Sequence, residues 1–96
     1  MIGPELPTGP EAAKAAGVTY RQLDYWTRRG YLKARERRGA SSGFNRAYLP
    51  VEVRVAKWMG LLTAQGMAPS IAAGVARDLD RIGHARLGPL TIQVAS

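Results

Sequence analysis

Two capping-box patterns near the start of the chain constrain its fold more than any other feature. Thr8 is followed three residues later by Glu11, and Thr19 by Gln22. In such a pattern the threonine side chain caps a helix and the Glu or Gln side chain reaches back to the capping residue. Residues 17 and 18 alone separate the two predicted helices, 11–16 and 19–29. Two short helices joined by a tight, glycine-containing turn predict a helix-turn-helix unit.

The second of these helices has the character of a recognition helix. Leu23 and Trp26 lie three residues apart and are expected to share a buried face. Gly30 follows the helix and suits the left-handed conformation of a helix end. An ordinary basic surface helix is the alternative, and the helix alone does not decide between them. The remaining faces, which would offer donors to DNA, carry Arg21, Tyr25, Arg28 and Arg29.

The distribution of charge supports the interpretation as a DNA-recognition helix. The chain has 14 Lys and Arg against 7 Asp and Glu, a net charge of +7. Residues 28–46 hold seven of the basic residues and a single acidic one, Glu36. A concentrated basic segment favours nucleic acid as the partner. An anionic membrane surface would require a wide apolar helix face, which this Gly- and Ser-interrupted segment lacks.

The basic segment also has the pattern of a β-hairpin. Residues 33–38 and 44–49 are predicted strands, and the small, polar residues 39–43 form the turn between them. The hairpin would be the wing of a winged helix-turn-helix. Its arms carry guanidinium groups, including those of Arg37, Arg38 and Arg46.

Two longer amphipathic helices are predicted after the wing. Pro50 opens the first, residues 51–65, and Pro69 opens the second, which ends before Gly83. In the second helix the apolar stripe consists of Ile71, Val75, Leu79 and Ile82. We therefore expect a mostly α fold of about four helices with a two-stranded wing.

Three regions follow from this pattern. Residues 1–7 are predicted to be a flexible tail, residues 8–83 the folded domain, and residues 84–96 a C-terminal tail. Within the last region, residues 91–94 are expected to form a strand. The segment 87–94 is a candidate for self-association, and the alternative is that it adds a third strand to the wing.

The order of these elements resembles the DNA-binding domain of the MerR family, a winged helix-turn-helix, over residues 8 to about 80. The resemblance implies that Arg21 and Tyr25 contact bases and backbone, that Arg46 contacts phosphate, and that Tyr48 is structural at the wing base. Asp24 departs from the family pattern and would either repel phosphate or hold Arg21 or Arg28. The segments that carry the resemblance are residues 11–18, 19–26, 29–32, 43–48, 50–53 and 61–66, with Ile71.

Two departures limit what the resemblance implies. The chain is expected to be too short for the long dimerisation helix and effector region that MerR regulators typically carry. It also has no cysteine, the residue that metal-sensing members use. No small-molecule effector is therefore expected, and the resemblance is to the DNA-binding half alone, as in compact regulators and excisionases.

Catalysis has no support in the sequence. His84 is a lone histidine with no Cys, second His or paired carboxylate nearby, and Ser41 and Ser42 have no base at hand. The glycines of residues 39–43 are not followed by the Gly-Lys-Ser/Thr of a phosphate-binding loop. No enzyme activity, cofactor or metal is predicted. With no membrane-spanning run or signal peptide, a cytoplasmic location is expected.

The predicted function is sequence-specific binding of double-stranded DNA, with self-association of copies on it. A small transcriptional regulator is the first expectation. A phage or plasmid excisionase and a protein-interaction module are the alternatives. The predicted DNA-contact residues are Thr19, Tyr20, Arg21, Tyr25, Arg28, Arg29, Arg37, Arg38 and Arg46.

Overall fold

Both predicted capping boxes are present in the computed structural model, which describes residues 6–36 and 46–94. Helix α1 (Gly9–Ala16) begins after Thr8, whose backbone N–H donates to Oε1 of Glu11 at 2.9 Å. Helix α2 (Tyr20–Arg28) begins after Thr19, whose Oγ1 accepts from the backbone N–H of Gln22 at 3.0 Å. The helix-turn-helix prediction is therefore confirmed.

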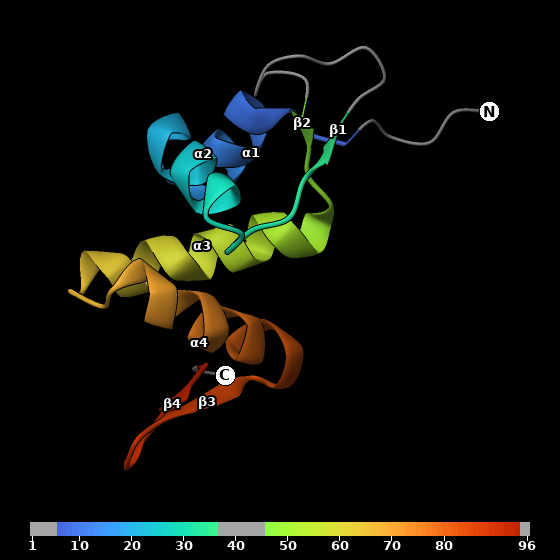
Figure 1. Ribbon diagram of the computed structural model, residues 1–96. Coiled ribbons are helices and arrows are strands. Elements are labelled where there is room, and N and C mark those ends of the chain that lie inside the picture. Colours follow the sequence, from blue (N-terminus) through green and yellow to red (C-terminus); the bar gives the residue numbers. More distant parts are fainter. Residues whose placement is uncertain (1–5, 37–45, 95–96) are drawn as a thin grey trace.

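The longer helices α3 (Pro50–Ala64) and α4 (Pro69–Ile82) also lie where the sequence places them. Each has proline in its first turn, where a missing N–H costs no hydrogen bond. Figure 1 shows α3 as the middle layer of the molecule, with α1 and α2 on one side and α4 on the other. This arrangement leaves the outer face of α2 away from the α3–α4 pair.

The core forms where the helix-turn-helix meets α3. Its fully buried large side chains are Leu23, Leu32, Tyr48, Val55 and Met59. Trp26 and the small side chains of α1 and α4 complete the cluster. Because the α1 contribution is alanine, α1 can approach α3 closely.

One prediction about α4 is wrong in detail. Ile71 and Ile82 were expected on the buried stripe, yet both are about half exposed. The buried face is centred instead on Ala72 and Ala76, together with Val75 and Leu79. An alanine stripe lets α4 lie close to α3, and this turns the two isoleucines at the helix ends towards solvent.

Of the predicted wing, the structure describes the base. Strand β1 (Arg35–Glu36) pairs antiparallel with β2 (Arg46–Ala47). Ala47 also forms an antiparallel bridge with Thr8, and the Tyr48 N–H donates to the Pro7 carbonyl at 3.0 Å. The start of the domain is thereby tied to the wing base. The rest of the predicted wing, residues 37–45, lies outside the described residues.

The C-terminal region forms a hairpin of its own. Strand β3 (His84–Leu87) pairs with β4 (Leu90–Gln93) across a two-residue turn. Gly88 in that turn has φ +58°, the left-handed region that such turns require. The hairpin packs on α4 (Figure 1). The alternative in which this segment adds a third strand to the wing is wrong, because β3 and β4 form a separate sheet.

Candidate nucleic-acid interface

The outer face of α2 gathers several of the predicted contact residues. Leu23 and Trp26 turn inward and are buried. Arg21, Tyr25 and Arg28 are exposed on the opposite side of the same helix, and the Tyr25 side chain is 52% exposed. This face therefore presents cationic and aromatic groups to solvent from a rigid helix.

The start of α2 is arranged differently from its middle. Thr19 is exposed, but its hydroxyl is engaged in the cap with Gln22. Tyr20 is half-buried and packs against the core cluster. Arg21 differs from these two residues. It is exposed and takes part in neither the cap nor the core cluster.

Asp24 organises the charges between α2 and the wing. One carboxylate oxygen lies 3.0 Å from Nε of Arg28, four residues along the helix. The other accepts from Nη1 of Arg46 on β2 at 2.7 Å. The Arg28 pair matches one of the two expected roles of Asp24, whereas the bridge to the wing was not predicted. The carboxylate holds two predicted phosphate contacts beside the recognition helix.

The two arginines differ in how freely they reach solvent. The Arg28 side chain is 70% exposed despite its ion pair, whereas the Arg46 side chain is 21% exposed. Burial works to lower the pKa of Arg46, but the contacts with Asp24 and Tyr48 outweigh it and raise that pKa overall. Arg46 therefore stays charged and fixed in direction, while Arg28 can extend outward.

Tyr48 anchors the wing to the recognition helix. Its ring is fully buried, and its hydroxyl lies 2.8 Å from Oγ1 of Thr27. The Thr27 hydroxyl donates to the Leu23 carbonyl at 2.7 Å, so the Tyr48 hydroxyl is the donor between the two side chains. The structural role that the resemblance implied for Tyr48 agrees with this geometry. Thr27 was missed, although a threonine inside a helix commonly bonds the carbonyl four residues back.

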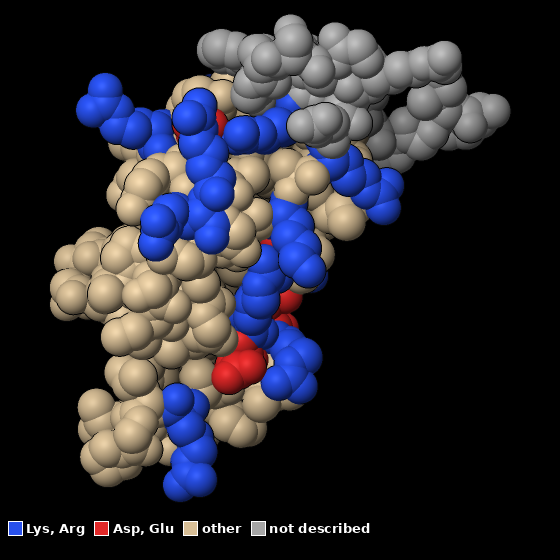
Figure 2. All heavy atoms as spheres, in the orientation of Figure 1, with Lys and Arg blue, Asp and Glu red and all other residues tan. Residues whose placement is uncertain are grey.

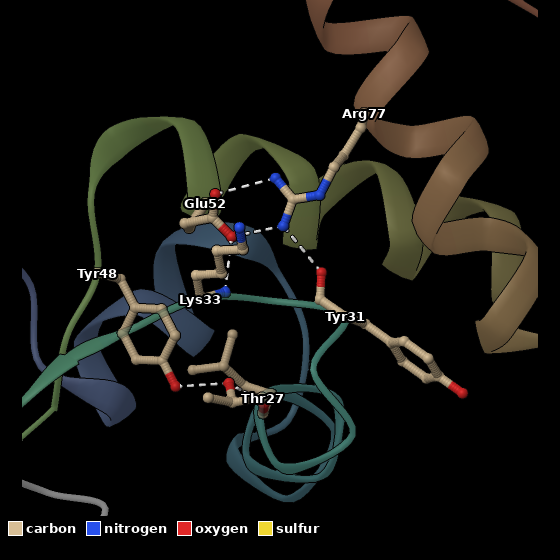
Figure 3. A network of polar contacts seen from close by, with 7 residues as sticks. Thr27, Tyr31, Lys33, Tyr48, Glu52 and Arg77 are labelled. Carbon is tan, nitrogen blue, oxygen red and sulfur yellow. Dashed lines mark hydrogen bonds and ion pairs between the residues drawn. The ribbon is translucent and has the colours of Figure 1, made fainter.

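An ion pair between the buried Glu52 and the partly exposed Arg77 fixes the segment that joins α2 to the wing (Figure 3). Glu52, near the start of α3, accepts from the Lys33 backbone N–H at 2.8 Å and from both terminal nitrogens of Arg77 on α4, at 3.0 and 2.8 Å. Arg77 also donates to the Tyr31 carbonyl at 2.9 Å. Burial tends to raise the pKa of Glu52, but the bonds from Arg77 and Lys33 prevail and lower it. Sequence reasoning missed this network.

Further cations surround the α2 face. Arg29, Lys33 and Arg35 are exposed, and contact with the Tyr31 side chain raises the pKa of Arg29. Figure 2 shows Lys and Arg side chains gathered over the end of the molecule that carries α2 and the wing strands. Arg37 and Arg38 lie outside the described residues. The described cations form a basic surface suited to a phosphate backbone.

Other kinds of site have little support in the described part of the chain. Nowhere in residues 6–36 and 46–94 do three or more His, Cys, Asp or Glu side chains gather as a metal ion would require. No described helix has the length and apolar character needed to cross a membrane. A hollow of about 370 Å³ lies between α3, α4 and the hairpin, and its lining includes Trp58, Leu61 and Val94.

Known proteins resemble the chain in the same region. The pattern of the MerR HTH family regulatory proteins matches residues 8–79 of the 96. HTH-type transcriptional regulators of Mycobacterium bovis and Mycobacterium tuberculosis are each 40% identical over 60 residues, which is 62% of this chain. The chain spans 27% of the length of these relatives. Because the family pattern covers both helices of the helix-turn-helix, the wing, α3 and most of α4, the chain belongs to the MerR family of helix-turn-helix regulatory proteins, which are non-enzymatic regulators and whose shared domain implies DNA binding.

Proposed function

We propose that this protein recognises a specific sequence in double-stranded DNA and regulates transcription. The observation that carries the proposal is the exposed Arg21 and Tyr25 face of α2, flanked by cations of the wing and of the helix end. In this arrangement α2 enters the major groove, and the wing follows the phosphate backbone or the adjacent minor groove. An α-helix fits the major groove, where each base pair presents a distinct pattern of donors and acceptors.

The contacts divide into two groups. Arg21 and Tyr25 reach base edges from the first turns of α2, with Thr19 and Tyr20 close to the backbone at its start. Phosphate contacts come from the arginines around them, which position the helix without reading sequence. This second group contains Arg28, Arg29 and Arg46, together with the predicted contacts Arg37 and Arg38.

Asp24 tunes this surface. A carboxylate next to a phosphate backbone is unfavourable in itself, yet here it neutralises part of the charge of Arg28 and Arg46. Non-specific attraction to any duplex is thereby reduced, while Arg21, which forms none of the ion pairs seen in the described part of the chain, stays available to the bases. The transcriptional role is supported by the relatives, which are described as transcriptional regulators.

Selection of bound duplexes from a random-sequence library tests the function directly. We expect a short preferred site and binding that weakens with salt by a log–log slope of about −0.9 per phosphate neutralised. A library without enrichment, or affinity that does not respond to salt, would contradict the proposal. Because a domain this small reads few base pairs, the preferred site is expected to contain two or more repeats.

Arg21→Ala separates base reading from backbone binding. We expect the variant to lose about 1–3 kcal/mol on the preferred site and less on unrelated duplexes, because a side chain that reads a base contributes only at its own base pair. Arg81→Ala is the matched control, since Arg81 is exposed on α4 and pairs with Asp78 there. Equal losses on all duplexes would make Arg21 a phosphate contact.

A further inference from the structure

Among residues 6–36 and 46–94, no strand other than β3 pairs with β4, so the outer edge of β4 is open in the described structure. The Val94 N–H donates to the Gly83 carbonyl at 2.8 Å, which makes these two residues a hydrogen-bonded pair. Bonded and non-bonded pairs alternate in an antiparallel ladder, so Ile92 and Ala85 form the next bonded pair. The backbone N–H and C=O groups of Thr91 and Gln93 therefore point away from β3, along the free side of β4.

The inner face of the hairpin is apolar and incompletely covered. Ala85 is buried, and Ile92 packs against the cluster that Val75 and Leu79 of α4 form. On the same face, however, Leu90 is 62% exposed and Val94 is 39% exposed. A two-stranded hairpin is only marginally stable by itself; α4 supports this one on its inner face, and a further strand on β4 would add to that support.

The edge lacks the features that normally prevent pairing with another chain. Folded proteins protect open edges with charged residues, especially lysine, or with proline. Residues 90–94, Leu-Thr-Ile-Gln-Val, contain neither. In a chain of net charge +7, this uncharged strand is also where two copies approach with the least repulsion. Because β4 is uncharged in a strongly basic molecule, we take a second copy of the chain as the partner that pairs with its open edge.

We propose that β4 pairs antiparallel with β4 of a second copy and joins the two hairpins into a four-stranded sheet. The register that uses every outward group of the strand places Thr91 opposite Gln93 of the second copy, and Ile92 opposite its own counterpart. Leu90 then faces Val94 of the other copy, so their exposed apolar surfaces cover each other. Moving the strands by two residues in one direction would place Pro89, which has no N–H, in a bonding position.

The pairing also has a consequence for DNA binding, and this consequence rests on the proposed function. Figure 1 shows the hairpin and α2 at opposite ends of the molecule, with α3 and α4 between them. Two copies joined through β4 would hold their recognition helices far apart, and related by a two-fold axis. Such a dimer favours inverted half-sites with a fixed spacing.

Disulfide trapping tests the register without DNA. Because the sequence contains no cysteine, an introduced cysteine can form a disulfide only with its counterpart in a second copy. Ile92→Cys places two thiols in a non-hydrogen-bonded pair, where Cα atoms lie roughly 4.5 Å apart, within reach of a disulfide. Leu90→Cys is the control: it is more exposed, but its counterpart lies four residues further along the strand. In a glutathione redox buffer we expect Ile92→Cys to form at least about tenfold more dimer than Leu90→Cys.

Gln93→Pro tests the hydrogen bonds of the edge. It removes an N–H that faces outward and keeps the ladder to β3, so the melting temperature should stay close to that of the natural chain. We expect sedimentation equilibrium to show a reversible dimer whose association constant falls about tenfold or more in this variant. A natural chain that is monomeric at all concentrations would overturn the pairing.

The pairing would also be overturned if the dimer persisted in Gln93→Pro and formed disulfides equally well through Leu90→Cys. The two copies would then contact each other through a different surface. Failure of the natural chain to bind any duplex would instead overturn the proposed function, since the dimer is measured without DNA.

Discussion

Asp24→Asn is expected to strengthen DNA binding and to make it more sensitive to salt. The carboxylate of Asp24 lies 3.0 Å from Nε of Arg28 and 2.7 Å from Nη1 of Arg46. Asparagine can still accept a hydrogen bond, but it carries no charge. Both guanidinium groups would then be available to phosphates, and one repulsive charge would be removed from the interface.

The size of the effect follows from the number of cations released. Each additional phosphate neutralised makes the slope of log binding constant against log salt steeper by about 0.9. Because Asp24 neutralises part of the charge of Arg28 and Arg46 in the natural chain, removing it should steepen the slope by at most about 1.8. Over a fourfold rise in salt, the variant should therefore lose more affinity than the natural chain, by a factor of up to roughly 12. Since all three side chains are partly exposed, the loss of folding stability should stay below about 1 kcal/mol.

Fluorescence anisotropy with a labelled duplex at several salt concentrations measures this slope. Asp78→Asn is the control, because it changes the net charge equally and frees Arg81 on α4 instead. Its slope should match that of the natural chain. The reasoning would be refuted if Asp24→Asn and Asp78→Asn had the same slope, or if Asp24→Asn bound more weakly at every salt concentration.

Two further predictions concern stability. A Cβ added to Gly60 in α3 would lie 2.6 Å from Cγ1 of Val18, whereas one added to Gly74 in α4 meets no atom within 4 Å. In urea titrations Gly60→Ala should therefore lower the free energy of unfolding by about 1–3 kcal/mol, while Gly74→Ala should raise it by about 0.5–1 kcal/mol; two changes of the same sign would contradict the close packing of the helix-turn-helix turn on α3. The pKa of Glu52 is lowered in the folded chain, so its stabilisation should be complete above the ordinary glutamate pKa and decline as the pH falls towards the lowered value. Glu52→Gln should remove this part of the acid dependence, and urea titrations between pH 7 and pH 3 that show the same dependence in both proteins would exclude it.

The backbone of this protein could be predicted largely from local sequence signals. Thr8 and Thr19 began their helices as expected, and both caps form within three or four residues of the chain. The prolines that open α3 and α4 act equally locally. Turn and capping chemistry is decided by neighbours in the sequence, so it can be recognised without knowing the fold.

Side-chain partnerships were harder to predict because they join distant parts of the chain. The sequence suggested Arg28 as a partner of Asp24, since the two are one helical turn apart. It gave no reason to expect Arg46, which reaches Asp24 only once the wing has folded beside α2. The buried face of α4 was equally hard to predict, because the close approach of Ala72 and Ala76 to the core depends on how α3 and α4 pack.

The Glu52 and Arg77 pair shows why such long-range contacts matter for the site. Glu52 holds the Lys33 backbone N–H, and Arg77 holds the Tyr31 carbonyl, so both ends of this short segment are fixed to the α3–α4 pair. The segment is separated from the end of α2 by two residues and leads into β1. The direction of α2 and that of the wing are therefore set by the same pair, Glu52 and Arg77. Phosphate and base contacts can act together only if the two elements keep a fixed relation, and this network supplies it although none of its bonds needs to touch DNA.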